Sequence, residues 1–303
     1  MDDNFHDLRS GQFAPETHMQ CAAAHLLPDG HPSCDTQTDY AVEDNFTSQP
    51  PTATAPTDTI GCTPSDGWLE LRTFAELFDD AQRARIAAGN RVLATGRPET
   101  FAAHFEAMKR TEDACALMLA RCYRRVVPAP IRQWQQDTPG IGEPLLARLL
   151  GHLGHPVIAT PHHWEGKGAD RVLVAGEPYE RTVAQLWQYC GHGDPARRIT
   201  KGMTADELAA IGSPRLKMLV HLNAVACMKC VGTARSRRSP YRDVYEARRL
   251  DTADRAHAAS CVRCGPSGKP AAEGSPWSAA HQLADALRIM GKELLRDLYR
   301  VAL

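Results

Sequence analysis

The sequence lacks any run of about 18 consecutive apolar residues, so it predicts no helix that could cross a membrane. It also lacks a secretory signal, because the opening stretch MDDNFHDLRS is acidic and has no apolar core. A large excess of charge of one sign is absent as well, since the formal net charge is −1. Nucleic-acid binding by this chain would therefore require a local concentration of Lys and Arg.

Basic and aromatic side chains are scarce in residues 1–63, where Arg9 is the single basic residue against ten acidic ones. This segment includes the tract TSQPPTATAPTDT and cannot bury enough apolar surface to offset its chain entropy. We predict that it forms a disordered acidic tail. The hydrophobic content of the whole chain is 43%, which leaves enough apolar residues for a core in the remainder.

Ten cysteines in a chain without a secretory signal are typical of reduced thiols or metal ligands rather than disulfides. We therefore expect a cytoplasmic protein.

Residues 64–127 show the spacing of two long amphipathic helices, and Pro128 and Pro130 end the second one. The second helix carries an apolar stripe that Glu112 interrupts: Phe101, Phe105, Met108, Cys115, Leu119, Cys122 and Val126. Two such helices predict an antiparallel hairpin arm, which could also join copies of the chain in a homo-oligomer.

Residues 128–303 read as mostly helical. Thr204 with Glu207 forms a capping-box pattern, and three Ser-Pro pairs at 213, 239 and 275 indicate helix starts. The stretch RVLVAGEPY predicts a short β-hairpin. The expected fold class is mainly α: a helical arm, then a helical domain that contains a helix-hairpin-helix and a small zinc-knuckle insertion.

The stretch DTPGIGEPLLARLLGHLG places Gly140, Ile141 and Gly142 between two short helices. Glycines allow the tight bend, Ile141 would lie between the helices, and amides bared at the second helix start would bind a phosphate. This helix-hairpin-helix pattern favours contact with a nucleic-acid backbone. The alternative is a bend that uses glycine only for close packing, and Glu143 adds negative charge where a phosphate would approach.

Cysteine and histidine residues near the C-terminus have the spacing of zinc ligands. Cys261 and Cys264 form a CxxC pair, which His257 and His281 would complete within residues 257–281. The alternative partners are Cys227 and Cys230, but that pair lies in a helix pattern, where residues three apart rarely converge on a metal. Either set predicts a structural zinc site.

Two segments concentrate positive charge and predict contact with phosphates. The nucleic-acid-binding candidates in them are Arg197, Arg198, Lys201, Arg235, Arg237, Arg238 and Arg242. The alternative is a solvated surface that balances nearby acidic residues. DNA is the expected partner, and structured RNA stays open as a second one.

The order of several short stretches in residues 98–303 resembles the C-terminal half of the insertion sequence 110 family of transposases, relatives of Piv-type invertases. These stretches are PGIGEPLLARLLGHLG, QLWQYCGHGDP, GSPRLKMLVHLNAVA, SPYRDVYEARR and ALRIMGKELLRDLYRVA. The resemblance implies a helical arm, a nucleic-acid-binding domain and a bridge-RNA partner. Two of the family's catalytic parts have no counterpart here. The region before residue 98 is too short for the family's RuvC-like nuclease domain, and Thr200 stands where its serine nucleophile is expected.

Three functions stay open on these grounds. The first is a DNA-binding protein without its own catalysis. The second is a transposase or recombinase completed by a partner nuclease, with Thr200 as its weak catalytic candidate. The third is a zinc-stabilised protein–protein adaptor.

Overall fold

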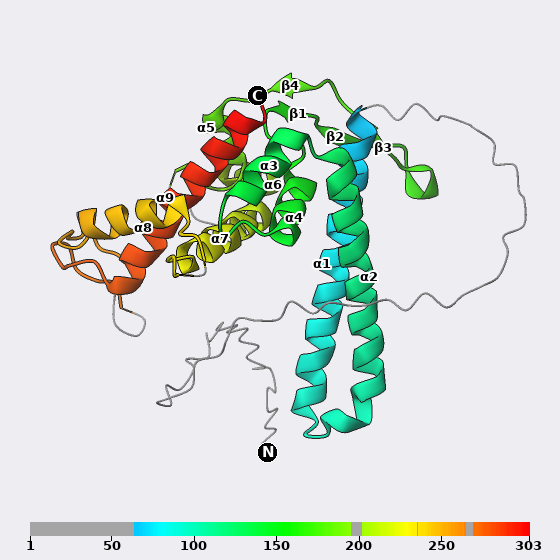
Figure 1. The fold of residues 1–303 in the computed structure, drawn as a ribbon, viewed down its shortest axis with the longest axis horizontal. Helices are drawn as coiled ribbons and strands as arrows, with labels where there is room; N and C mark the ends of the chain where they lie inside the picture. The colour runs from blue at the N-terminus through cyan, green and yellow to red at the C-terminus, as the bar shows by residue number, and fades with distance from the viewer. Residues whose placement is uncertain (1–63, 195–201, 235, 263, 265–268) are drawn as a thin grey trace, which may run out of the picture. The chain divides into compact units, whose positions relative to one another are not determined.

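The computed structural model describes residues 64–194, 202–234, 236–262, 264 and 269–303, and this part is mainly helical, as predicted (Figure 1). The predicted acidic tail, residues 1–63, lies outside the described residues. No helix in the described ranges combines the length and the apolar character that a membrane crossing needs.

The first two long helices form the predicted arm, with α1 (Pro64–Ala94) and α2 (Ala102–Val126) packed side by side (Figure 1). The short helix η1 (Pro98–Phe101) connects them. Glu112, which interrupts the apolar stripe of α2, is buried and accepts hydrogen bonds from Gln82 and Arg85 of α1. The break in the apolar pattern is therefore a polar contact between the two helices.

Seven further helices follow the arm in the described residues. They are α3 (Ala129–Asp137), α4 (Glu143–Leu153), α5 (Val183–Tyr189), α6 (Ala205–Ile211), α7 (Pro214–Lys229), α8 (Pro240–Asp251) and α9 (Ala279–Val301). α4 packs between α1 and α7, and α9 packs against α7 and α8. Leucines of α4, α7 and α9 form much of one continuous apolar core, so these helices hold the hairpin and the C-terminal segments together.

A buried charge cluster joins the arm to the helices behind it. Asp79 of α1 is 4% exposed and accepts two hydrogen bonds from Arg148 and one from His152, both on α4. Arg215 of α7 lies 3.3 Å from the same carboxylate. Burial by itself would raise the pKa of Asp79, but the His152 and Arg148 bonds and the two arginine charges outweigh it and lower the pKa.

The strands differ from the sequence prediction. β2 (His162–Glu165) pairs with β3 (Val172–Ala175), and β1 (Ile158–Ala159) pairs with β4 (Tyr179–Glu180), both antiparallel. A short helix, η2 (Gly168–Asp170), lies between β2 and β3. The stretch RVLVAGEPY therefore contributes one strand to each of two ladders, and the prediction that it pairs with itself was wrong. Local sequence could not reveal its partners, because Tyr179 at its end pairs with Ala159, 20 residues upstream.

Helix starts agree with the capping patterns except at one position. Thr204 and Glu207 form both bonds of the predicted capping box, and Ser213 caps α7. Ser239 precedes α8 but makes no side-chain cap bond. The predicted start at Ser275-Pro276 was wrong, because Pro276 pairs with Ala256 in a β-bridge and α9 begins after Ser278.

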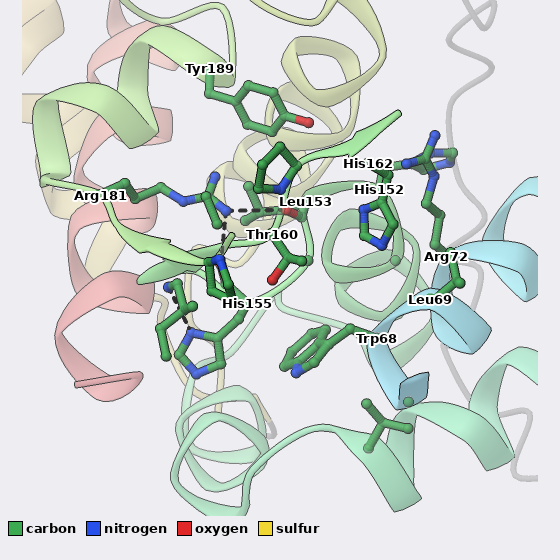
Figure 2. A pocket seen from close by; sticks show the side chains of 18 of the residues that line it. Trp68, Leu69, Arg72, His152, Leu153, His155, Thr160, His162, Arg181 and Tyr189 are labelled. Carbon is green, nitrogen blue, oxygen red and sulfur yellow. Dashed lines mark hydrogen bonds between the residues drawn. The ribbon is translucent and has the colours of Figure 1, made fainter. Parts of the chain in front are cut away.

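A pocket of about 1110 Å³ opens between the start of α1, the end of α4, the strands and α5 (Figure 2). Trp68 of α1 and Tyr189 of α5 lie on opposite sides of it. Arg181, which follows β4, reaches in from a third side. The sequence patterns did not predict this pocket, because its walls come from segments that are far apart in the chain.

Candidate metal centre and nucleic-acid interface

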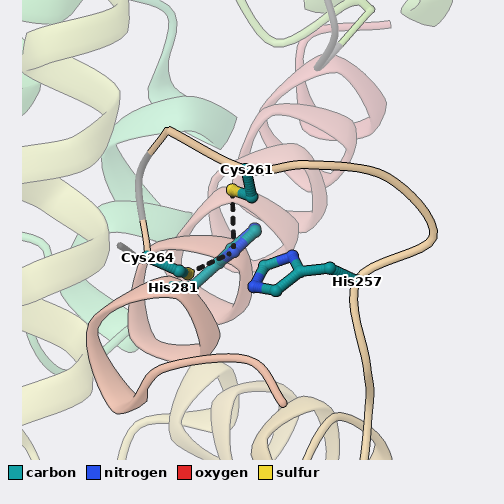
Figure 3. Close-up of side chains that lie close together, drawn as sticks. All are labelled: His257, Cys261, Cys264 and His281. Carbon is teal, nitrogen blue, oxygen red and sulfur yellow. Dashed lines mark hydrogen bonds between the residues drawn. The ribbon is translucent and has the colours of Figure 1, made fainter. Parts of the chain in front are cut away.

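His257, Cys261, Cys264 and His281 come together at the start of α9 (Figure 3). One ligand atom from each residue lies within 4.8 Å of the other three. Cys264 Sγ is 3.1 Å and Cys261 Sγ is 3.9 Å from Nδ1 of His281. These four side chains could hold a metal ion, and they are the set that the sequence analysis favoured.

The backbone around these residues explains their convergence. Cys261 and Ala271 exchange two hydrogen bonds of 2.9 and 2.8 Å, which close the chain into a narrow loop. The amide of Cys264 donates to the carbonyl of Cys261, so the two cysteines lie in the same turn. His281 is placed by α9, where its amide donates to the Ser278 hydroxyl. The cluster thus joins an irregular loop to a rigid helix.

Ring contacts fix the two histidines. The indole of Trp277 stacks on His281 with 4.1 Å between ring centroids and 4° between planes, and His257 lies 5.2 Å from His281. His257 is 5% exposed, and its Nε2 atom is buried without a hydrogen-bond partner in the described residues. A buried ring nitrogen without a partner is costly, and a metal ion would satisfy it.

The alternative ligands Cys227 and Cys230 lie elsewhere. Cys227 is fully buried within α7, and burial raises the pKa of its thiol to about 11. Cys230 is the C-cap residue of the same helix. In the described ranges neither belongs to a metal-binding group, so a four-cysteine site is not formed there. Cys227 instead packs in the apolar core.

The hairpin between α3 and α4 has the predicted glycine bend. Gly140 has a φ of +97°, and a Cβ atom there would lie 2.6 Å from Cα of Cys227. Ile141 is 3% exposed and joins the core, as predicted. Gly142 has a φ of −79°, is exposed and is the N-cap of α4. The two glycines therefore differ: Gly140 is needed for packing against α7, and Gly142 faces solvent.

Two arginines lie at the ends of this bend. Arg237 donates to the backbone carbonyl of Asp137 at the end of α3. Arg124 of α2 makes hydrogen bonds of 3.1 and 2.8 Å to the two carboxylate oxygens of Glu143 at the start of α4. The negative charge that the sequence places beside the bend is thus balanced by a neighbouring guanidinium.

The other predicted basic residues are used in different ways. Arg238 pairs with Asp243 and Glu246, and Arg242 pairs with Glu246 and stacks over the ring of Tyr245. Arg237 has no carboxylate partner in the described ranges. Five predicted residues lie outside the described residues: Arg197, Arg198, Thr200, Lys201 and Arg235.

A second basic surface surrounds His192, and the sequence analysis did not single it out. A hollow of about 500 Å³ is lined by His192 together with Lys217 and His221 of α7 and Arg288 of α9. Two carboxylates, Asp194 and Asp285, also line it, and Asp285 pairs with Arg288. Both ring nitrogens of His192 are buried without partners in the described part of the chain. Burial, together with the charges of the surrounding basic side chains, lowers the pKa of this imidazole to about 4.

A signal for this surface was present in the sequence. Lys217 and His221 are four residues apart, as are Arg288 and Lys292, so each pair shares one helix face. Lys292 lies 4.1 Å above the ring of Trp187, which holds it near His192. Only the packing of α7 against α9 brings the two pairs together.

The comparisons with protein families, with curated proteins and with solved structures found no match for this chain.

Proposed function

We propose that this protein binds nucleic-acid backbones through the hairpin of α3 and α4. One observation carries the proposal: Arg237 lies at the end of α3 and Arg124 at the start of α4, on either side of an exposed glycine. These arginines come from segments far apart in the sequence. A phosphate that approaches Gly142 would meet the positive charge of Arg237 on one side and, on the other, a Glu143 carboxylate that Arg124 neutralises.

The start of α4 supplies hydrogen-bond donors for such a phosphate. The amides of Gly142 and Glu143 have no acceptor in the described residues, and they lie at the positive end of the helix dipole. Pro144 occupies the next position, where a helix needs no donor. Arg124 offsets the charge of Glu143, which would otherwise repel an anion.

The basic surface around His192 supports the same function. It lies near the start of α7, whereas Gly140 packs near its end, at Cys227. Ten residues of α-helix separate Lys217 from Cys227, which is about 15 Å. A single strand carries a phosphate roughly every 3.4 Å of duplex axis, so one backbone could reach both surfaces. Contacts of this kind hold the backbone and do not read sequence.

Fluorescence anisotropy with labelled duplex DNA, a four-way junction and a structured RNA, each at two salt concentrations, tests the proposal. Gly142→Asp places a carboxylate at the bend without the packing conflict of Gly140. Arg237→Gln removes the arginine that has no carboxylate partner. We expect each substitution to weaken binding about tenfold. Arg237→Gln should also reduce the magnitude of the slope of log binding constant against log salt concentration by about one, because one phosphate contact is lost.

The matched control is Arg300→Gln, at the end of α9, where the arginine pairs with Asp297. It should leave affinity within about twofold of the wild type. Salt-independent binding, or equal affinities for all three variants, would contradict the proposal. In that case the better candidate is a protein–protein adaptor, because packing against α7 is already a sufficient reason for Gly140.

We also propose that the His257, Cys261, Cys264 and His281 cluster holds a structural zinc ion. Two thiolates and two imidazoles suit tetrahedral zinc, whose bonds of about 2.0–2.3 Å place donors roughly 3.3–3.8 Å apart. The separations of 3.1 and 3.9 Å from His281 Nδ1 to the two thiols lie just below and just above that range, so small side-chain shifts would bring the donors to zinc distances. With four protein ligands, zinc would have no open position and would stabilise the loop rather than catalyse a reaction.

Metal analysis of the purified protein tests the zinc assignment. We expect about one equivalent of zinc in the wild type and in Cys230→Ser, and less than about half an equivalent in Cys264→Ser. Zinc loss in Cys230→Ser but not in Cys264→Ser would overturn the ligand assignment.

Kinship with the insertion sequence 110 transposases is part of this proposal and rests on the order of the sequence stretches given above. Thr200, the weak nucleophile candidate, lies outside the described residues. Nucleic-acid binding is therefore proposed without strand cleavage. A cleavage assay that finds product, lost in Thr200→Ala, would instead favour a recombinase.

A further inference from the structure

The pocket between α1, α4 and α5 contains a buried arginine without a counter-ion. Arg181 is 6% exposed, and no carboxylate lies within 4.0 Å of its guanidinium in the described residues. Its Nη2 atom donates to the carbonyl of His155 at 3.0 Å and, more weakly, to that of Leu153 at 3.5 Å. Its Nε atom is buried and has no hydrogen-bond partner among the described residues. A buried charge of this kind is costly unless an anion compensates it.

The position of Arg181 is well defined. Its amide donates to Val157, and its carbonyl accepts from the hydroxyl of Tyr299 on α9, so the backbone is held from two sides. The guanidinium lies 5.3 Å from the ring centroid of Tyr189. The side chain is thus directed toward the pocket (Figure 2), and its guanidinium is part of the pocket wall that an anion would approach.

The walls on either side of Arg181 suit a planar group. Tyr189 and Trp68 lie on opposite sides of the pocket, as Figure 2 shows. Trp68 is held edge-on by His155 at 5.5 Å between ring centroids. The lining also includes the hydroxyl of Thr160 and the imidazole of His152, whose Nε2 is held by Asp79. Aromatic rings stack with nucleobases, and an arginine fork matches the geometry of phosphate.

We propose that this pocket binds a nucleotide, with its phosphate on Arg181 and its base between Trp68 and Tyr189. A volume of about 1110 Å³ is ample for a molecule of that size. The nucleotide could be free, or it could be the 5′-phosphorylated end of a strand. The first source is independent of the proposed hairpin contact, and the second adds to it. The site shares the end of α4 with the hairpin, but it contains none of Gly142, Arg124 and Arg237, and it shares no residue with the metal cluster or the basic surface around His192.

Isothermal titration calorimetry on the full-length, metal-loaded protein tests the inference. The probes are adenosine and guanosine monophosphate, cytidine and uridine monophosphate, adenosine and inorganic phosphate. We expect at least one monophosphate to bind with a dissociation constant below about 1 mM, and adenosine or phosphate alone to bind at least about tenfold more weakly. Absence of binding by every monophosphate and by a phosphorylated oligonucleotide would overturn the proposal, as would phosphate that binds as tightly as the nucleotides.

A pair of short oligonucleotides distinguishes the two sources. If the ligand is a strand end, a 5′-phosphorylated oligonucleotide should bind more tightly than its 5′-hydroxyl counterpart, and Arg181→Gln should abolish the difference. Gly142→Asp should weaken both oligonucleotides equally and leave mononucleotide binding unchanged. Failure of the hairpin proposal and failure of the pocket proposal thus give different patterns.

Pairs of substitutions at the same position separate a loss of binding from a loss of folding. Arg181→Gln should weaken nucleotide binding about tenfold or more, and Arg181→Lys should lose less because it keeps the charge. Tyr189→Leu should weaken binding, and Tyr189→Phe should restore it, because stacking requires only the ring. Unchanged affinity in both Arg181→Gln and Tyr189→Leu, with circular dichroism showing intact folding, would overturn the assignment.

Discussion

Gly140 is the residue at which the bend of the hairpin and the packing of the core meet. Its positive φ strains any side chain, and the Cys227 backbone leaves no room for one. We expect Gly140→Ala to lower the free energy of unfolding by about 2–4 kcal/mol, from backbone strain and overpacking together. Gly142→Ala, where the nearest atom is 3.8 Å away, should cost less than about 1 kcal/mol. Urea denaturation of both variants measures the difference, and equal losses would contradict this account.

Asp79 is a second residue for which the structure predicts a large effect on stability. Its carboxylate is buried among Arg148, His152 and Arg215, so Asp79→Asn should cost about 3 kcal/mol at neutral pH. The folded pKa is lowered, so the stabilisation is complete above about pH 4 and is lost as the pH falls through the lowered value. The gap in unfolding free energy between wild type and variant should therefore shrink in acid.

The neighbouring Asp80 is a matched control for that experiment. It is exposed and pairs only with Arg83 on the same helix. Asp80→Asn should lower the free energy of unfolding by less than about 1 kcal/mol. Its difference from the wild type should change little between pH 7 and pH 3. If the difference in unfolding free energy between wild type and Asp79→Asn instead grows in acid, the ionised carboxylate of Asp79 destabilises the folded state, which contradicts this account.

At the scale of elements, we expect the loop before α9 to depend on the proposed metal ion, because its described residues bury few apolar side chains. Removal of metal with a chelator should release the amides of Cys261, Ala271 and Gly274, whose acceptors lie within the loop. Hydrogen exchange at these sites should become at least about tenfold faster, whereas Leu119 in the buried part of α2 should keep its protection. Equal acceleration at Leu119 would mean that the metal stabilises the whole fold and not the loop.

At the scale of the whole molecule, charge is divided along the chain. Residues 1–63 carry ten acidic residues and one basic residue, so residues 64–303 carry 34 basic residues against 26 acidic ones. A net charge near zero thus conceals a basic helical part. We expect a fragment of residues 64–303 to bind duplex DNA about tenfold more tightly than the full chain at low salt.

Screening provides the check on that expectation. The two affinities should converge as the ionic strength rises, because long-range repulsion between the acidic segment and DNA is screened. Circular dichroism of the fragment confirms that its helices are intact before affinities are compared. A difference that persists at about 0.5 M salt would indicate a direct contact of residues 1–63 with the binding surface rather than a charge effect.

Patterns that depend on near neighbours could be predicted from the sequence. The two arm helices, the capping box at Thr204 and the burial of Ile141 follow from local periodicity and side-chain chemistry. The metal-binding group was also predicted, because CxxC spacing and two flanking histidines limit the ways in which four ligands can meet.

Features that depend on distant segments could not be predicted. The partners of β3 and β4, the Asp79 cluster and the pocket around Arg181 all join residues that are separated by many others. Ser275-Pro276 shows the same limit, because a helix-start pattern there is overridden by pairing with Ala256.

The sequence by itself determined the helical class of this protein, its bend and the four residues that could hold a metal ion, since short-range spacing encodes each of them. Only the tertiary structure decided which glycine of the bend faces solvent, which arginines lie beside it and which remain without a counter-ion. The physical reason is that burial and charge pairing depend on all the neighbours in space, and packing of α4 and α7 selects those neighbours.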